Sequence, residues 1–230
     1  MNTNSRIVVI TGAAGGLGRV VAHAFGGQGT HLVLVDVPGA PLPASDANQT
    51  AVAVNLTDAE ATLQALKPVF ERIGPASVLC NIAGGFTMGT PVHETPPQTW
   101  QQMAEMNVST LINASRAVVP GMLAAGRGKV VNVAAASATS GKATMGAYVL
   151  AKSGVARLTE TMALELREQG INVNAVAPSI IDTPANRAAM PDADPKRWVS
   201  PAQLAAVIRF LASDDAAAVH GAVIPVVGLS

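Results

Sequence analysis

The 230-residue sequence has few charges, few aromatic rings and one thiol. Charged residues make up 13% of the chain, and the 15 basic side chains cancel the 15 acidic ones, which argues against nucleic acid or an anionic membrane as a partner. Aromatic residues make up 3%, which leaves few rings to stack on bases. The single cysteine, Cys80, cannot form an internal disulfide, so we expect a reducing compartment.

Long apolar runs are missing as well. The first six residues are polar, the apolar run of residues 7–10 is short, and no stretch approaches the roughly 18 apolar residues of a membrane-spanning helix. We therefore expect a cytoplasmic protein with no membrane partner. The four histidines are scattered without the spacing of metal ligands, so no metal site is predicted.

Short strand-like segments alternate with longer helical patterns. The predicted strands are rich in Val and Ile and cover residues 7–11, 31–36, 50–54, 77–80, 129–134, 171–177 and 221–227. The predicted helices cover residues 17–28, 58–73, 98–125, 147–169 and 201–213. This alternation is typical of an α/β fold, a doubly wound parallel sheet of about seven strands with helices on both faces.

A single domain over residues 1–230 is expected, with a loop at about 178–200 on the substrate side. In such sheets ligands bind at the carboxyl ends of the strands, which is where the motifs described below fall. Pro225 cannot donate a backbone hydrogen bond to a neighbouring strand, so the last strand is predicted at the sheet edge.

A glycine-rich turn follows the first predicted strand. It contains Gly12, Gly16, Leu17 and Gly18, which we take as candidate dinucleotide-binding residues. Glycines let the backbone approach a pyrophosphate closely, and the start of the following helix offers free N–H groups. The plain alternative is a glycine-rich turn that binds no ligand.

Asp36 ends the second predicted strand. A carboxylate at this place accepts both hydroxyl groups of an adenosine ribose and repels a 2′-phosphate. No Arg or Lys stands at positions 13, 14 or 37–49 to hold such a phosphate. We therefore predict NAD(H) in preference to NADP(H) as cofactor; the alternative is a solvated acid at the end of a strand.

Tyr148 and Lys152 stand four residues apart on a predicted helix, so their side chains share one face. A free Tyr has a pKa near ~10, which is too high for a base at neutral pH. An ammonium about 4 Å away is expected to lower that pKa by up to ~3 units before desolvation. Tyr148 is the only tyrosine of the chain, so it is the candidate acid or base.

Together these residues resemble the short-chain dehydrogenase/reductase family along nearly the whole chain. The glycine turn, the Asn-Ile-Ala-Gly segment of residues 81–84 and the Tyr148/Lys152 pair carry the resemblance. It implies that Asn107 anchors a proton-relay water and that Lys152 also bonds the nicotinamide ribose. It further implies cofactor contacts from Asn55, Leu56, Asn81, Ala83, Gly84, Pro178 and Thr183.

Several positions depart from the family pattern. The family usually has a catalytic Ser thirteen residues before the Tyr, and here that position is Ala135. Ser137, two residues further on, is either its replacement after remodelling of the loop or a solvated loop residue. Loss of one donor to a developing oxyanion typically costs ~10²–10³ in rate. In addition, Asn55 replaces a common Asp, Ser179 replaces a Gly, and residues 37–49 are too few for the usual helix.

These departures resemble one branch of the family, the dihydropteridine reductases. The segment of residues 81–86 and the loop of residues 182–198 carry this closer resemblance. Four apolar residues of loops expected to overhang the site are candidate substrate contacts: Met88, Met145, Met190 and Trp198. The family resemblance also implies a homodimer or homotetramer, paired through the helices at 98–125 and 147–169.

Three functions remain open. The preferred hypothesis is an NADH-dependent reductase that transfers hydride to a carbonyl or C=N carbon of a small molecule, with Tyr148 as proton donor and quinonoid dihydropterin as a possible substrate. The second is an ordinary carbonyl reductase or alcohol dehydrogenase, such as a 3-oxoacyl reductase, which uses Ser137. The third is a non-catalytic NAD(H)-binding regulatory protein, which Ala135 suggests.

Overall fold

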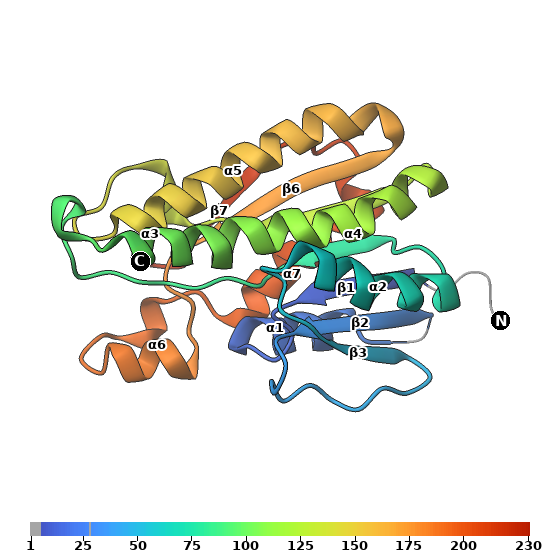
Figure 1. Cartoon of the computed structure of the whole chain (residues 1–230). Coiled ribbons are helices and arrows are strands. Elements are labelled where there is room, and N and C mark those ends of the chain that lie inside the picture. Colours follow the sequence, from blue (N-terminus) through green and yellow to red (C-terminus); the bar gives the residue numbers. More distant parts are fainter. Residues whose placement is uncertain (1–5, 28) are drawn as a thin grey trace.

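The computed structural model describes residues 6–27 and 29–230, and its centre is a seven-stranded sheet in which all neighbouring strands are parallel (Figure 1). The strands lie in the order β3-β2-β1-β4-β5-β6-β7. Their bounds are β1 Arg6–Thr11, β2 Thr30–Asp36, β3 Gln49–Ala53, β4 Val78–Asn81, β5 Gly128–Val133, β6 Ile171–Pro178 and β7 Val223–Val226. The predicted fold class is confirmed.

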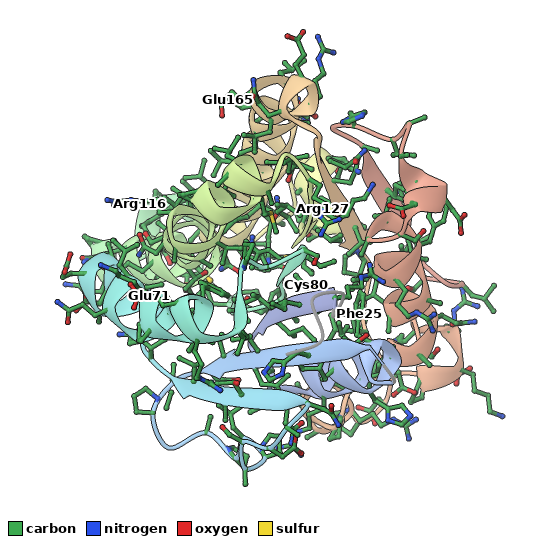
Figure 2. The ribbon with its side chains drawn as sticks, turned by 90° about the vertical axis from the view of Figure 1, so that its right-hand side faces the viewer. Phe25, Glu71, Cys80, Arg116, Arg127 and Glu165 are labelled. Atoms are coloured by element: carbon green, nitrogen blue, oxygen red, sulfur yellow. The ribbon has the colours of Figure 1, made fainter. Side chains whose placement is uncertain are left out.

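Helices cover both faces of the sheet. In Figure 2, α1 and α7 lie on one side of the strands, whereas α2, α4 and α5 lie on the other. The α-helices are α1 Gly16–Phe25, α2 Ala59–Ile73, α3 Pro97–Ala104, α4 Thr110–Ala125, α5 Gly146–Leu166, α6 Pro184–Ala189 and α7 Pro201–Leu211. None of the described helices has the length and apolar character needed to cross a bilayer.

The alternation of side chains along β1 explains the two layers. Val8 and Ile10 pack in a cluster with α1 and α7, while Val9 packs in the opposite cluster with α2 and α4. All three side chains are fully buried, and each contributes roughly 1.5–3 kcal/mol of burial free energy. A strand buried on both faces has to be apolar at every position, which is why these strands read as continuous Val/Ile runs.

The direction of winding reverses between β1 and β4. From β1 the chain proceeds outward to β2 and β3, and from β4 it proceeds the other way to β7. Ligands of such sheets bind beside this reversal, at the carboxyl ends of the strands. In Figure 1 the loop after β4, the beginning of α5 and helix α6 all lie at one end of the molecule, opposite the N-terminus.

Local signals in the sequence fix several element boundaries. Asp58 caps the start of α2 by accepting a hydrogen bond from the backbone N–H of Ala61 at 2.9 Å. Ser200 forms a capping box with Gln203 at the start of α7. The predicted position of Pro225 on an edge strand is confirmed, because β7 is the last strand of the sheet.

Three predicted segments differ in the structure. The helix expected over 98–125 is interrupted at Glu105–Ser109 by one π-helical turn, which separates α3 from α4. The stretch of residues 178–200 is not a plain loop, since it contains α6 and a short 3₁₀ turn at Pro195–Arg197. Helix α1 ends at Phe25 because Gly26 is extended; Gln28, the predicted end, lies outside the described residues.

Cys80 lies in the interior of the sheet, as Figure 2 shows. Burial raises the pKa of its thiol to about 12, so it stays protonated at neutral pH and is an inert core residue.

Candidate active site

The glycine turn between β1 and α1 is built so that only glycines fit. Gly12 has a φ of +64°, and a Cβ at Gly18 would lie 2.0 Å from the carbonyl oxygen of Gly12. No side chain caps the first residue of α1, so the N–H groups of its first turn are available to an anion. The turn therefore fits a pyrophosphate.

The carboxylate of Asp36 is fixed beside this turn. One of its oxygens accepts a hydrogen bond from the N–H of Ala14 and the other from the N–H of Val37, each at 2.8 Å. Arg19 donates from Nε to the carbonyl oxygen of Ala14 at 2.7 Å. Arg19 was not among the predicted site residues, although its place in the first turn of α1, directly after Gly18, is a signal present in the sequence.

The loops that follow β1 and β4 are joined. The hydroxyl of Thr11 accepts hydrogen bonds from the N–H groups of Ile82 and Ala83, at 3.0 and 3.1 Å. A Cβ at Gly12 would lie 2.9 Å from the backbone of Ala83, so the two loops pack backbone against backbone. Asn81, at the end of β4, donates to Asn132 on β5 at 2.9 Å. The Oδ1 atom of Asn81 is buried and has no partner within the described residues, so it can accept a donor from a ligand or water.

Asn107 lies in the π-helical turn and binds the loop after β4 with both ends of its side-chain amide. Its Oδ1 accepts from the N–H of Gly85, and its Nδ2 donates to the carbonyl of Gly85, both at 3.1 Å. The same Nδ2 also donates to the carbonyl of Met103 at 3.0 Å. A Cβ at Gly84 would lie 2.7 Å from the Asn107 oxygen, so glycine is needed there. The side chain of Asn107 is thus a brace for this loop.

Lys152 and Tyr148 lie on the first two turns of α5. The ammonium of Lys152 donates to the carbonyl of Val133, at the end of β5, at 2.8 Å. Burial lowers the pKa of Lys152 to about 8 and raises the pKa of Tyr148 to about 12. The expected lowering of the Tyr148 pKa is therefore wrong, because burial of the phenol disfavours its charged form. At neutral pH Tyr148 holds its proton, which suits a proton donor.

The position of the usual Ser is occupied by the buried side chain of Ala135. Ser137 follows in a 3₁₀ turn at Ala136–Thr139 and is half-buried. This turn is held to α5, because the hydroxyl of Ser153 donates to the carbonyl of Ala138 at 2.9 Å.

The segment after β6 folds over the glycine turn. A Cβ at Gly16 would lie 3.1 Å from the methyl carbon of Thr183, so Thr183 is in contact with the turn. Thr183 also caps α6 by accepting from the N–H of Asn186. Pro178 ends β6 beside Val226 of β7. An ion pair between Asp182 and Arg187, at 2.6 Å, lies at the exposed start of this segment.

The four predicted substrate residues do not share one environment. Met88 is 58% exposed, and Met145 and Met190 are half-buried. Trp198 is buried, and its backbone packs against Gly228 near the C-terminus. Its contact with a substrate stays a prediction.

Asn55 and Leu56 form the turn after β3. The side chain of Asn55 accepts from both the N–H and the hydroxyl of Thr57, while Leu56 is buried. Asn113 on α4 donates to the carbonyls of Leu56 and Thr57, at 2.9 and 3.3 Å. This clamp from α4 was missed, since nothing in the sequence near Asn113 marks it.

Phe86 was also missed as a site residue. Its ring meets the ring of Tyr148 edge to face, with centroids 4.8 Å apart and an angle of 80° between the planes. The signal was present in the sequence, because an aromatic residue in a Gly-rich loop is unusual in a chain with 3% aromatics.

Comparisons with known proteins identify the family of the chain. The family model described as short chain dehydrogenase matches residues 6–194. The meso-2,3-butanediol dehydrogenase of Serratia marcescens is 33% identical over 99% of this chain and 95% of its own. A 3-oxoacyl-(acyl-carrier-protein) reductase of Vibrio cholerae is 29% identical over 99% and 98% of the two chains. The structure of an NAD+-bound xylitol dehydrogenase superposes with a TM-score of 0.88 at 25% identity, over 99% of this chain and all of that one.

The match of the family model covers the glycine turn, the braced loop after β4 and the Tyr148/Lys152 pair. The protein therefore belongs to the short-chain dehydrogenase family and is an NAD(P)-dependent oxidoreductase.

Proposed function

We propose that the protein is an NAD(H)-preferring reductase that transfers hydride to a carbonyl or C=N carbon of a small molecule, with Tyr148 as the proton donor. One observation carries this proposal: a protonated phenol and a buried ammonium lie on one helix face, next to a loop braced by Asn107, at the carboxyl ends of the strands.

Each residue of the site has a separate role in the proposed reaction. The bound dinucleotide supplies the hydride. Tyr148 releases its proton to the oxygen or nitrogen that the hydride transfer leaves electron-rich, so hydride and proton together complete the reduction. Lys152 holds the ribose hydroxyls near the phenol and offsets the negative charge that forms on it. We propose that Asn107 also anchors the proton-relay water.

The cofactor preference follows from Asp36. Its carboxylate is held at the end of β2 in a position to accept ribose hydroxyls and to repel a 2′-phosphate. Arg19 is the one cation that hydrogen bonds to the glycine turn within the described residues, and it does so through Nε alone, so the proposed preference rests on the repulsion from Asp36. We expect NADH to bind more tightly than NADPH in calorimetric titration. An equal or higher affinity for NADPH would refute this part of the proposal.

The substrate is argued from Ala135. A site without the usual hydroxyl favours a substrate that needs little support for a developing oxyanion, such as quinonoid dihydropterin. The ordinary carbonyl reductase is the second candidate, and the dehydrogenase and 3-oxoacyl reductase relatives favour it. Ser137→Ala separates the two: a rate loss above about tenfold supports a role for Ser137 in carbonyl reduction, and little change supports the first candidate.

The decisive experiment is NADH oxidation, followed by absorbance, with quinonoid dihydropterin and a panel of ketones. Tyr148→Phe should abolish turnover and leave NADH binding unchanged. If the folded wild-type protein turns over none of these substrates, the result counts against the proposed reductase and its substrate class.

We also propose that the protein is a homodimer or homotetramer of the cytoplasm. Ala114 and Ala163, two small residues of the helices expected to pair subunits, are buried within the chain itself and so cannot form that contact. Large apolar side chains of the same helices that are exposed and available for it are Leu150, Leu164, Ile112 and Leu123. Light scattering during size-exclusion chromatography tests the assembly, and a monomer would refute it.

A further inference from the structure

We propose that Phe86 is the specificity-determining residue of the substrate site, and that its ring selects substrates whose carbonyl belongs to a planar, conjugated ring over acyclic ones. The inference rests on the proposed function, because it concerns the substrate that accepts the proton of Tyr148.

The position of Phe86 is fixed by the residue before it. The peptide of Gly85 is bound on both sides by the amide of Asn107. A Cβ at Gly85 would lie 2.4 Å from the terminal methyl of Met106, so the backbone lies directly on that side chain. The chain direction at Gly85 is therefore set by the π-helical turn that carries Met106 and Asn107, and Phe86 is placed by the fold rather than by a free loop.

Phe86 and Tyr148 form a continuous aromatic surface. Tyr148 packs on one side against the buried cluster of Met103, Ala147 and Ala151, and Phe86 meets it from another side, edge to face. The phenylalanine ring is 57% exposed, so more than half of its area remains to pack against a ligand. A large exposed aromatic ring in contact with the catalytic phenol marks a binding surface.

A second contact holds the other end of the segment that contains Phe86 and Met88; we call this segment of residues 85–89 the aromatic wall. The N–H of Gly89 donates to the carbonyl of Thr144 at 2.9 Å, which links the loop after β4 to the loop before α5. Thr144 has a φ of +61°, an uncommon conformation for a β-branched residue, which persists only where the surrounding structure imposes it. Between these two anchors stand Phe86 and Met88, both more than half exposed.

The chemistry of this wall indicates the substrate class. An aromatic ring and a thioether offer dispersion and π contacts to a flat ring, but no hydrogen bonds to the hydroxyl groups of a polyol. The buried methyl of Ala135 takes the place of the hydroxyl that would otherwise hold the substrate oxygen. Orientation of the reacting carbonyl then depends on how the body of the substrate packs, and a planar ring packs in fewer ways than a flexible chain.

Two α-dicarbonyl probes test this. Isatin carries its dicarbonyl unit in a planar aromatic ring system, whereas 2,3-butanedione carries the same unit in an open chain. We expect wild type to prefer isatin. Phe86→Ala and the non-aromatic Phe86→Leu should each raise KM for isatin about tenfold with a smaller effect on kcat, and leave kcat/KM for butanedione within about threefold. Phe86→Trp should restore the preference.

Equal losses on both probes, or no loss on either, would overturn the proposal, because Phe86 would then act only by placing Tyr148 or not at all. A second readout does not need turnover. Tyr148 is the only tyrosine, so protein labelled with ¹³C-tyrosine gives one ring signal. Isatin should shift this signal in wild type and in Phe86→Trp but not in Phe86→Ala. If wild type reduces neither these probes nor quinonoid dihydropterin and the ketone panel, the proposed function fails; a shift of the tyrosine signal would still support the aromatic surface, and no shift would refute it.

Discussion

The Nζ atom of Lys152 donates a hydrogen bond to the carbonyl oxygen of Val133 at 2.8 Å, which ties helix α5 to the end of strand β5. The bond holds a cation in the interior of the protein, where its charged form is poorly solvated. The proposed function therefore requires Lys152 to be charged, although burial of that charge destabilises the folded protein.

Replacing Lys152 by Met should stabilise the protein while abolishing activity. Burial lowers the lysine pKa to about 8, from 10.5, so the charged form opposes folding at pH 7. Removing that charge is expected to raise the free energy of unfolding by about 1–3 kcal/mol, less the lost bond to Val133. Urea denaturation measures it, with Lys67→Met on the exposed face of α2 as the control that should change little. A less stable Lys152→Met protein would contradict the prediction.

The same shift predicts how stability depends on pH. Between pH 8 and about 9 the unfolded chain binds the Lys152 proton and the folded chain releases it, so wild-type stability should rise across this range. Above pH 9 the raised pKa of Cys80 acts in the opposite direction. The rise should be absent in Lys152→Met. Urea midpoints measured at half-unit steps of pH check it, and a flat wild-type profile would speak against a buried cation.

Tyr148 should titrate near pH 12 in the folded protein and near ~10 after unfolding. Because the folded pKa is the higher one, this tyrosine contributes stability that is complete below pH 10 and is lost as the pH rises through 12. Absorbance at the tyrosinate wavelength reports this residue alone, since the chain has one tyrosine. A folded-state titration at or below pH 10 would show instead that the cation of Lys152 dominates.

Asn107→Ala should affect the part of the site that contains the Tyr148 phenol. Asn113→Ala should affect the part that contains the turn after β3. Each change removes a buried amide that makes two or more hydrogen bonds, and each should lower stability by about 2–4 kcal/mol. Only Asn107→Ala releases Gly85, so it should reduce kcat, while Asn113→Ala should mainly weaken NADH binding. Steady-state kinetics and calorimetry separate the two, and identical effects would argue against distinct roles.

Gly18→Ala should abolish dinucleotide binding, because its Cβ would lie 2.0 Å from the carbonyl of Gly12. The matched control is Gly154→Ala on α5, whose Cβ meets one methyl group at an ordinary 3.7 Å. That control should gain up to about 1 kcal/mol of helix stability. Thermal unfolding with and without NADH tests both, and an unaltered NADH-induced shift in Gly18→Ala would refute the assignment of the turn.

The sheet and its two faces were predictable from the sequence because burial on both sides forces continuous Val/Ile runs, as in β1. The cap at Asp58 and the edge position of Pro225 were predictable because each rests on a backbone hydrogen bond that the residue type provides or lacks. These features depend on local chemistry or on period, and both can be read along the chain.

The rest depends on which residues meet in space. The π-helical turn at Asn107 exists together with a bond to Gly85, 22 positions earlier, which no local pattern indicates. The pKa of Tyr148 was predicted in the wrong direction because spacing shows a neighbouring cation but not the burial of the phenol. The contact of Phe86 with Tyr148 likewise joins residues 62 positions apart.

The contact between the loops that follow β1 and β4 has a consequence for folding. Thr11 and Ile82 belong to opposite halves of the sheet, and the contact between their loops forms only when those halves have paired. A fragment holding β1 to β3 would contain every glycine of the turn and still lack the loop after β4 that packs against it. Tight NADH binding therefore requires that β1 and β4 have paired. A ligand that binds only this paired state stabilises it by mass action, so added NADH should stabilise variants whose central strands pair weakly.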